Sequence, residues 1–330
     1  METKKKRVFS GIQPTGDIHI GNYLGAIKNW VASQDDYDNI FCVVDLHAIT
    51  VPQDPKVLKR KTRELAALLL AAGIDPAKSV LFVQSQISAH CELAWIMNCS
   101  IPMGWLERMT QFKEKSGANK ERVSVGLFDY PALMAADVLL YDADGVPVGE
   151  DQKQHVELMR DAAQRFNAQY GDTFVVPEPI IPKLGARIMG LDDPTKKMSK
   201  SEDAQNHAIK LLDPPDVIRR KFKRATTDSE RTIVFDENRL AMTNLLTIYG
   251  AFSGWSNDAI EAHFEGKGYG DLKKELAEVV IAGLEPIQAR FKELMADRDG
   301  LTRLLRSNAD QVRPIAEATV RRARKRLGLE

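Results

Sequence analysis

The segment with the clearest chemical potential reads Gln-Pro-Thr-Gly-Asp-Ile-His-Ile-Gly-Asn at residues 13–22, between an apolar run and a helical pattern. Gly16 and Gly21 permit a tight turn and a close approach of the backbone to a ligand. The N-terminus of the following helix offers unpaired N–H groups and a positive dipole end, which favour phosphate. Three side chains add hydrogen-bond donors: Thr15, His19 and Asn22. The segment matches neither GxGxxG nor the P-loop pattern, so both a phosphate site and an ordinary strand–helix turn are open interpretations.

A second segment, Pro-Thr-Lys-Lys-Met-Ser-Lys-Ser at residues 194–201, places two lysines three positions apart among serines. It has no helical apolar face, which favours a loop. Lys197 and Lys200 could hold a triphosphate as point charges and shift as pyrophosphate departs. The alternative interpretation is a solvated basic loop.

The elements that must position these segments alternate between strand and helix in the first half of the chain. Apolar runs at 7–12, 40–44 and 80–83 predict buried strands, and residues 21–31 and 57–72 have helical spacing. Strands separated by helices predict a parallel sheet of the Rossmann type. Such sheets bind ligands beyond the carboxyl ends of their strands, which is where residues 13–22 lie.

The second half of the chain has a different character. After about residue 207 we find no strand-like run, and helical patterning covers 216–224, 240–252, 271–296 and 301–327. The sequence therefore predicts an α/β domain over residues 1–206 followed by an all-helical domain over residues 207–330.

Composition narrows the class of protein. The chain has 330 residues and equal numbers of acidic and basic side chains, 46 of each, so overall charge gives no support to RNA binding. Cys42, Cys91 and Cys99 form no CxxC pair, which favours reduced thiols over a disulfide framework. No apolar run approaches the ~20 residues that span a bilayer. We expect a cytoplasmic protein without a membrane segment.

Together the two segments resemble the paired HIGH-type and KMSKS-type signatures of class I aminoacyl-tRNA synthetases. The first stands as His-Ile-Gly-Asn at 19–22 and the second, complete, as Lys-Met-Ser-Lys-Ser at 197–201. Asn22 stands in place of the last histidine of the HIGH-type signature, as it commonly does in the tryptophan members of the class. His19 stands where many of those members have threonine. Further blocks resemble the bacterial-type tryptophanyl-tRNA synthetase family and extend the similarity over nearly the whole chain: 9–16, 107–115, 130–137, 149–155 and 265–270.

The resemblance implies a class I Rossmann-type catalytic domain with a helical connecting insertion over 1–206, and an anticodon-binding helical domain over 207–330. It implies ATP-dependent activation of L-tryptophan to tryptophanyl-adenylate and transfer to the terminal ribose of tRNA(Trp), releasing AMP and pyrophosphate. ATP would bring Mg²⁺ with it, since no carboxylate cluster suggests a dedicated metal site. The family also implies a homodimer bridged by one tRNA.

Asp137 is the candidate for tryptophan recognition. It lies in an apolar segment at 132–141, where a carboxylate is costly without a partner. A salt-bridged core aspartate is one interpretation. The resemblance instead implies that Asp137 accepts a hydrogen bond from the indole N–H of tryptophan, because an ionised carboxylate can act only as an acceptor. Several residues complete the predicted site: Phe9, Met134 and Val146 as ring walls or simply core, His47 at the pocket mouth, and, from the resemblance, Tyr130 and Gln152 at the α-amino group.

The resemblance also supplies the ATP contacts. Gln13 matches a contact to the substrate carboxylate or α-phosphate, Gly149 and Asp151 match the ribose contacts, and Gly21, Ile188 and Met198 are expected around adenine. Lys115, Lys197 and Lys200 would carry the β- and γ-phosphates and, with Gln13, make up the predicted catalytic set. The remaining members of the predicted ATP site are Pro14, Thr15, His19, Asn22, Glu150, Ser199 and Ser201.

Three other functions compete with this one. A tyrosyl-tRNA synthetase of the same class is disfavoured by residues 149–155, and a non-catalytic RNA-binding paralogue by the intact signature segments. A small nucleotidyltransferase would not need the helical domain.

Two local basic runs, at 219–224 and 321–326, are the candidates for RNA contact. The alternative interpretation is that they are solvated helix faces. We expect His155 to be a polar helix residue, and His90, His207 and His263 to be solvated or satisfied in the core.

Overall fold

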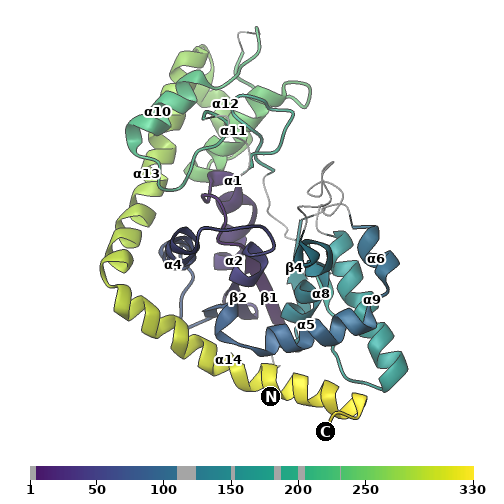
Figure 1. Ribbon diagram of the computed structural model, residues 1–330. Coiled ribbons are helices and arrows are strands. Elements are labelled where there is room, and N and C mark those ends of the chain that lie inside the picture. The colour runs from purple at the N-terminus through teal and green to yellow at the C-terminus, as the bar shows by residue number, and fades with distance from the viewer. Residues whose placement is uncertain (1–4, 110–123, 150–152, 182–186, 200–204, 231) are drawn as a thin grey trace.

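The computed structural model describes residues 5–109, 124–149, 153–181, 187–199, 205–230 and 232–330. Its centre is a five-stranded sheet in the order β3-β2-β1-β4-β5, with every pairing parallel (Figure 1). The strands are β1 (Arg7–Ile12), β2 (Asp38–Val43), β3 (Val80–Val83), β4 (Gly145–Pro147) and β5 (Glu178–Ile180). The predicted parallel sheet is confirmed; β4 and β5, of three residues each, are too short to leave a pattern in the sequence.

Helices follow the strands and cover the sheet. One continuous helical run after β1 comprises α1 (Ile20–Asn22), the π-helical turn η1 (Tyr23–Ile27) and α2 (Lys28–Ala32). The others in this half are α3 (Asp45–Ala48), α4 (Pro55–Ala71), the 3-10 turn η2 (Gln84–Gln86), α5 (Ala89–Ser100), α6 (Met103–Glu107), α8 (Val125–Leu139) and α9 (Lys153–Tyr170). The predicted helix at 57–72 is present, capped by the Asp54 carboxylate and ended by Gly73, whose φ of 116° suits glycine.

The second half is helical. It contains α10 (Pro215–Arg224), α11 (Leu240–Ser253), α12 (Asn257–Phe264), α13 (Tyr269–Ala296) and α14 (Arg298–Leu327). Four of these were predicted; α12 was not, because it spans only two turns. Beyond residue 207 the described residues form no named strand. Among the helices that the structure describes, none is both long and apolar enough to cross a bilayer.

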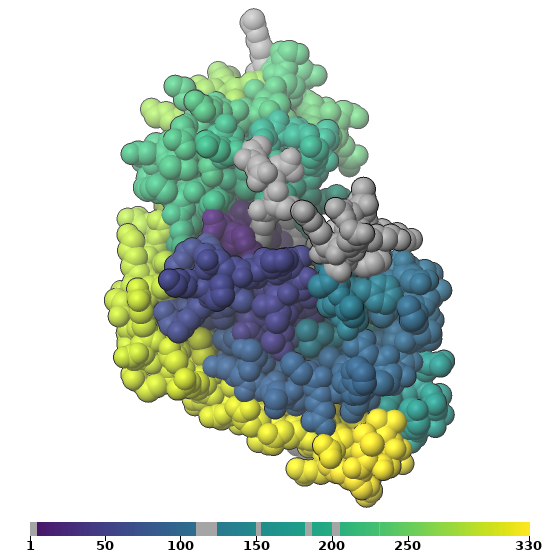
Figure 2. Space-filling view, in the orientation of Figure 1, coloured from purple at the N-terminus to yellow at the C-terminus, as the bar shows by residue number. Residues whose placement is uncertain are grey.

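Helix α14 returns from the helical region to the α/β half. It runs along the lower edge of the molecule in Figure 1 and forms a continuous rim with α13 in Figure 2. The buried Asn308 amide donates to the Leu81 carbonyl of β3 at 3.0 Å, and Arg322 reaches Asp142 at 2.5 Å. Five small or β-branched side chains of the same helix join the core under α5, α8 and α9: Ala309, Val312, Ala316, Val320 and Ala323. The boundary near residue 206 stays a prediction.

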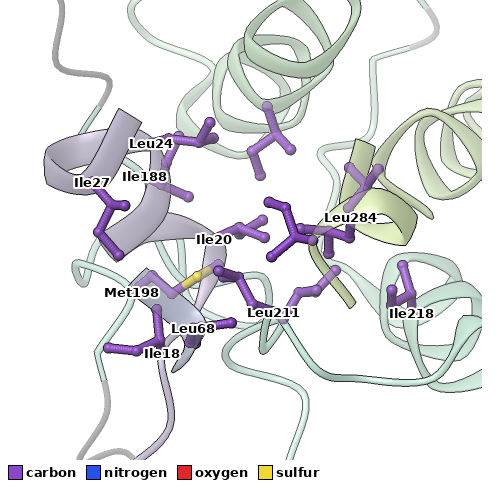
Figure 3. Close-up of a cluster of buried hydrophobic side chains, with 14 of the residues drawn as sticks. Ile18, Ile20, Leu24, Ile27, Leu68, Ile188, Met198, Leu211, Ile218 and Leu284 are labelled. Carbon is purple, nitrogen blue, oxygen red and sulfur yellow. The ribbon is translucent and has the colours of Figure 1, made fainter. Parts of the chain in front are cut away.

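A second apolar cluster joins the first signature segment to the helical region. Figure 3 shows Ile20 near the middle of this cluster, with Met198 on one side and Leu211 and Leu284 on the other. Ile18 and Ile20 are buried here while His19, between them, lines a cavity. The alternation typical of an extended strand therefore directs the apolar side chains into the core and the histidine towards the cavity.

Candidate active site

A cavity of about 700 Å³ opens at the carboxyl ends of the strands, which is within the range of ligand-binding sites. It lies between the two apolar clusters, so Phe9 and Val146 face it from one side and Ile188 and Met198 from the other. Fourteen of the predicted site residues line it: Phe9, Gln13, His19, Gly21, Asn22, His47, Tyr130, Met134, Asp137, Val146, Gly149, Ile188, Lys197 and Met198.

The first signature segment is held by a reciprocal cap. The Asn22 backbone N–H donates to His19 Nδ1 at 3.2 Å, and the His19 backbone N–H donates to Asn22 Oδ1 at 3.3 Å. Because Nδ1 accepts, a neutral His19 ring carries its proton on Nε2. Gly21 is needed beside this cap, since a Cβ there would come within 2.9 Å of His19 Nδ1. His19 and Asn22, two of the three side chains predicted as hydrogen-bond donors, therefore also shape the helix start.

The same segment is fastened to the helical region by main-chain hydrogen bonds. Ile20 N–H donates to the Ile209 carbonyl and Leu211 N–H to the Ile18 carbonyl, each at 2.9 Å. Asp17 adds ion pairs to Lys61 of α4 and Lys210. Burial raises the pKa of Asp17, but hydrogen bonds from the two lysines outweigh it and hold that pKa at about 2.

Lys197 lies on a short hairpin at the cavity edge. Met189 and Lys197 form an antiparallel bridge, and Met198 N–H donates to the Ile188 carbonyl at 3.0 Å. Asn244 of α11 holds the first strand of the hairpin by two hydrogen bonds to Met189. Its amide oxygen accepts from the Met189 N–H at 2.8 Å, and its amide nitrogen donates to the Met189 carbonyl at 3.0 Å. The hairpin thus presents Ile188 and Met198 to the apolar wall and leaves Lys197 exposed to solvent at the rim.

Asp137 is a buried carboxylate in the wall of the cavity. It is 2% exposed, and its oxygens lie 2.7 Å from His47 Nε2, 2.7 Å from His90 Nδ1 and 2.6 Å from Gln84 Nε2. Burial raises the pKa of the carboxyl, but the charge interaction and hydrogen bonding with His47 and His90 hold it at about 2. The carboxylate is therefore ionised, and three of its roughly four lone-pair positions are filled by protein donors.

Helix α8 directs three side chains into the cavity at helical spacing. Tyr130, Met134 and Asp137 are four and three residues apart, which places them on one face. Behind them Tyr141 accepts or donates at His90 Nε2 over 2.8 Å and stacks on Phe9 with ring centroids 5.6 Å apart. Burial raises the pKa of Tyr141 far above its ordinary value, so its hydroxyl stays protonated.

The other predicted residues lie elsewhere. Pro14 lines a smaller adjoining cavity, and Thr15 donates to Gln13 Oε1 at 3.5 Å; neither these two nor Ser199 lines the large cavity. Six predictions fall outside the described residues: Lys115, Glu150, Asp151, Gln152, Lys200 and Ser201.

Sequence reasoning missed several residues that the fold brings to the cavity. Arg187 adds a cation beside Ile188, and Ser10 adds a buried hydroxyl that has no hydrogen-bond partner within the part of the chain described. His155, expected to be a polar helix residue, is buried at the wall with Nε2 3.0 Å from the Tyr130 hydroxyl. The one usable signal was that Ser10 is a polar residue inside the apolar run predicted as the first strand.

The remaining histidines have carboxylate partners. His90 and His207 are fully buried, as one of the two predicted outcomes requires, and pair with Asp137 and Asp192. His263 is half-buried and pairs with Glu275 at 2.7 Å. Gln84 and His90, which no motif identified, prove to be the supports of the predicted specificity residue.

The family model described as tRNA synthetases class I (W and Y) matches residues 1–285. With a parallel sheet, both signature segments and a deep cavity between them, the chain belongs to this family of class I tRNA synthetases for tryptophan and tyrosine.

Comparison with individual proteins narrows the assignment. A tryptophan--tRNA ligase of Wolinella succinogenes is 62% identical, with 98% of this chain and 99% of the relative covered. Among solved structures, tryptophanyl-tRNA synthetase from Mycoplasma pneumoniae is 38% identical with a TM-score of 0.91, covering 99% and 98% of the two chains. The enzyme from Campylobacter jejuni, complexed with ADP and tryptophan, is 34% identical with a TM-score of 0.83, covering 98% and 99%. Within the family, the chain is of the bacterial tryptophan type.

The lowered pKa of Asp137 predicts a specific acid sensitivity. Since the folded-state pKa of about 2 lies below the ordinary 3.8, the carboxylate stabilises the fold above about pH 4, and this contribution disappears as the pH falls towards 2. We expect wild type to lose about 2 kcal/mol more than Asp137→Asn over that interval. Urea denaturation at closely spaced pH values measures this free energy of unfolding. An equal loss of stability in the two proteins between about pH 4 and pH 2 would refute the lowered pKa of Asp137.

Proposed function

We propose that this enzyme binds ATP and L-tryptophan side by side in the cavity, forms tryptophanyl-adenylate and transfers the tryptophanyl group to the terminal ribose of tRNA(Trp). The observation that carries the proposal is the buried Asp137 carboxylate at the cavity wall, ionised and already held by three N–H donors. It can only accept a hydrogen bond, and indole has a single donor. The Campylobacter jejuni relative, solved with ADP and tryptophan, supports the pairing of ligands.

In this proposal the tryptophan ring lies between Phe9, Met134 and Val146, with its N–H on the remaining lone pair of Asp137. His47 orients Asp137 from the side. Tyr130, together with Gln152 outside the described residues, binds the α-amino group. Phenylalanine would fit the walls but would leave the carboxylate without its last donor, which rejects it by several powers of ten.

ATP takes the side of the cavity formed by the two signature segments. Adenine lies between Gly21, Ile188 and Met198, and Gly149 approaches the ribose. Gln13 reaches the α-phosphate and Lys197 the outer phosphates. The remaining predicted members of this site keep their proposed roles: Pro14, Thr15, His19, Asn22, Ser199 and, outside the described residues, Lys115, Glu150, Asp151, Lys200 and Ser201.

The reaction then needs positioning more than covalent chemistry by the protein. The tryptophan carboxylate attacks the α-phosphorus in line, the bond to the bridging oxygen breaks, and pyrophosphate leaves with its charge stabilised by Lys197 and the other lysines. The adenylate carbonyl is next attacked by the terminal ribose hydroxyl of tRNA, by family resemblance the 2′-hydroxyl, and AMP departs.

Mg²⁺ is proposed to enter with the triphosphate. Among the residues described, Asp137 is the buried carboxylate of the cavity. Its oxygens already accept hydrogen bonds from three N–H groups, so they are not available together as ligands for a metal ion. Mg²⁺ favours phosphate oxygens and water, so ATP itself supplies the fitting donor set. It would neutralise charge on the phosphates, while the lysines orient them.

The helical region is proposed to read the anticodon. On α10, Arg219 is paired with Glu278 and the buried Lys221 with Asp213, so these two serve the fold. Arg220, Lys223 and Arg224 of the same helix are exposed and remain candidates for phosphate contact. In the C-terminal run Arg322 and Arg324 likewise pair with Asp142 and Glu92.

We further propose a cytoplasmic homodimer. Trp95 on α5 is 70% exposed, between the exposed Cys91 and Cys99 at spacings of four residues. Met103 and Val125 are exposed on the adjoining α6 and α8. An apolar surface of this kind is typical of an interface. The free thiols accord with a reducing compartment.

The function is tested by ATP–pyrophosphate exchange with each of the twenty amino acids and no tRNA. We expect exchange with tryptophan alone, because the single free acceptor position of Asp137 matches indole. Exchange driven by tyrosine would instead identify the protein as a tyrosyl-tRNA synthetase. No exchange from folded protein would refute the catalytic proposal.

Asp137→Asn tests the specificity residue. Loss of the anionic acceptor should lower kcat/KM for tryptophan by roughly 100-fold, while ATP affinity changes little. Asp129→Asn, on the same helix and bonded to Asn98, is the matched control and should keep normal exchange. Normal tryptophan kinetics in the Asp137 variant would remove this residue from the pocket.

Trp95→Glu tests the interface. A buried charge at each copy of the surface should convert the dimer to monomers, seen as a halved mass in light scattering after size exclusion. Trp255→Glu, at an exposed tryptophan of the helical region, should leave the mass unchanged. A dimer that survives Trp95→Glu would place the interface elsewhere.

A further inference from the structure

His207 lies against the hairpin that carries Lys197 and has a polar contact at each ring nitrogen. Nδ1 is 2.7 Å from an Asp192 carboxylate oxygen, and Nε2 is 3.3 Å from the Lys197 carbonyl oxygen. The residue is only 2% exposed. Both partners are acceptors, so the ring donates to both at once only when each nitrogen carries a proton. The side chain thus connects the turn of the hairpin with its second strand.

The ring fits there because residue 190 is glycine. A Cβ on Gly190 would lie 2.2 Å from His207 Cε1 and 2.5 Å from Nδ1, so any other side chain would displace the ring. The backbone is fixed as well, since Leu191 N–H donates to the His207 carbonyl at 3.0 Å. The orientation of the imidazole is therefore set by the hairpin that it supports.

The other contacts from the helical region hold a different part of the hairpin. Asn244 binds the backbone of Met189, and Thr226 binds the carbonyl oxygens of Leu191 and Asp192. These contacts fix the first strand and the start of the turn. His207 adds a contact on the second strand, at the carbonyl of the lysine itself.

We infer that His207 is a positioning residue for amino-acid activation. Its bridge from Asp192 to the Lys197 carbonyl fixes the backbone from which the Lys197 ammonium extends to the outer phosphates. The inference rests on the proposed function of Lys197, because His207 itself does not line the cavity. Its effect on the reaction passes through the lysine.

The test compares His207→Phe, His207→Gln and His207→Asn in ATP–pyrophosphate exchange. Phenylalanine keeps a flat ring over Gly190 and removes both donors, so kcat should fall by about tenfold while KM for tryptophan stays nearly constant. A glutamine amide reaches the place of Nε2 and should restore most of kcat. An asparagine amide reaches only the place of Nδ1 and should restore little.

A double-mutant cycle with Lys197→Ala separates this inference from the proposed function. The lysine variant keeps its carbonyl and loses its ammonium, so His207→Phe should have almost no further effect on kcat in that background. If Lys197→Ala lowers kcat and His207→Phe either does not or adds its full effect, His207 is not a positioning residue, although the proposed function stands. If Lys197→Ala leaves kcat unchanged, the proposed role of Lys197 fails and the inference about His207 fails with it, whereas tryptophan-dependent exchange still supports the proposed reaction.

His263→Phe is the matched control. This histidine also binds a carboxylate, Glu275 at 2.7 Å, but lies in α12 away from the hairpin. It should lower the melting temperature at most and leave kcat unchanged. An equal fall of kcat in His207→Phe and His263→Phe would overturn the inference, because the effect would then follow from general destabilisation.

Discussion

The site depends on one stretch of main-chain pairing, between Ile18–Ile20 and Ile209–Leu211. Two hydrogen bonds of 2.9 Å join these segments, which lie about 190 residues apart in the sequence. Since side chains alternate along an extended strand, the pairing buries the isoleucines in the cluster of Figure 3 and turns His19 to the cavity. A shift of one residue would exchange these faces and remove both the core contact and the capped helix start.

The same pairing makes the helical region part of the active site. Asp17 extends it with ion pairs to Lys61 and Lys210, and Asn244 and His207 fasten the lysine hairpin from the same side. The C-terminal helix α14 then returns to the sheet, where Asn308 binds a β3 carbonyl. The helical region is thus attached to the α/β half at both of its ends. Displacement of either region would strain the contacts that position the residues proposed to bind phosphate.

Much of this architecture could be predicted from local signals. Three strands contain apolar runs, and four C-terminal helices have clear periodicity, so β1 to β3, α10, α11, α13 and α14 were predicted close to their bounds. The rest leaves no local trace: β4 and β5 have three residues each and exist because neighbouring strands pair with them. Nor could the sequence show that the end of α14 packs in the catalytic core, because helical periodicity identifies a buried face and not its partner.

The polar support of Asp137 shows where sequence reasoning on the site ends. The sequence indicated that a carboxylate in an apolar helix needs partners, but these come from three other elements: His47 of α3, Gln84 of η2 and His90 of α5. None of them belongs to a signature motif. They matter because a carboxylate with three fixed donors cannot turn towards a poorly matched ligand, and the direction of its remaining lone pair is set before tryptophan arrives. If Asp137 binds the indole N–H as we propose, selectivity for indole follows from the rigidity of this network as much as from the charge of Asp137.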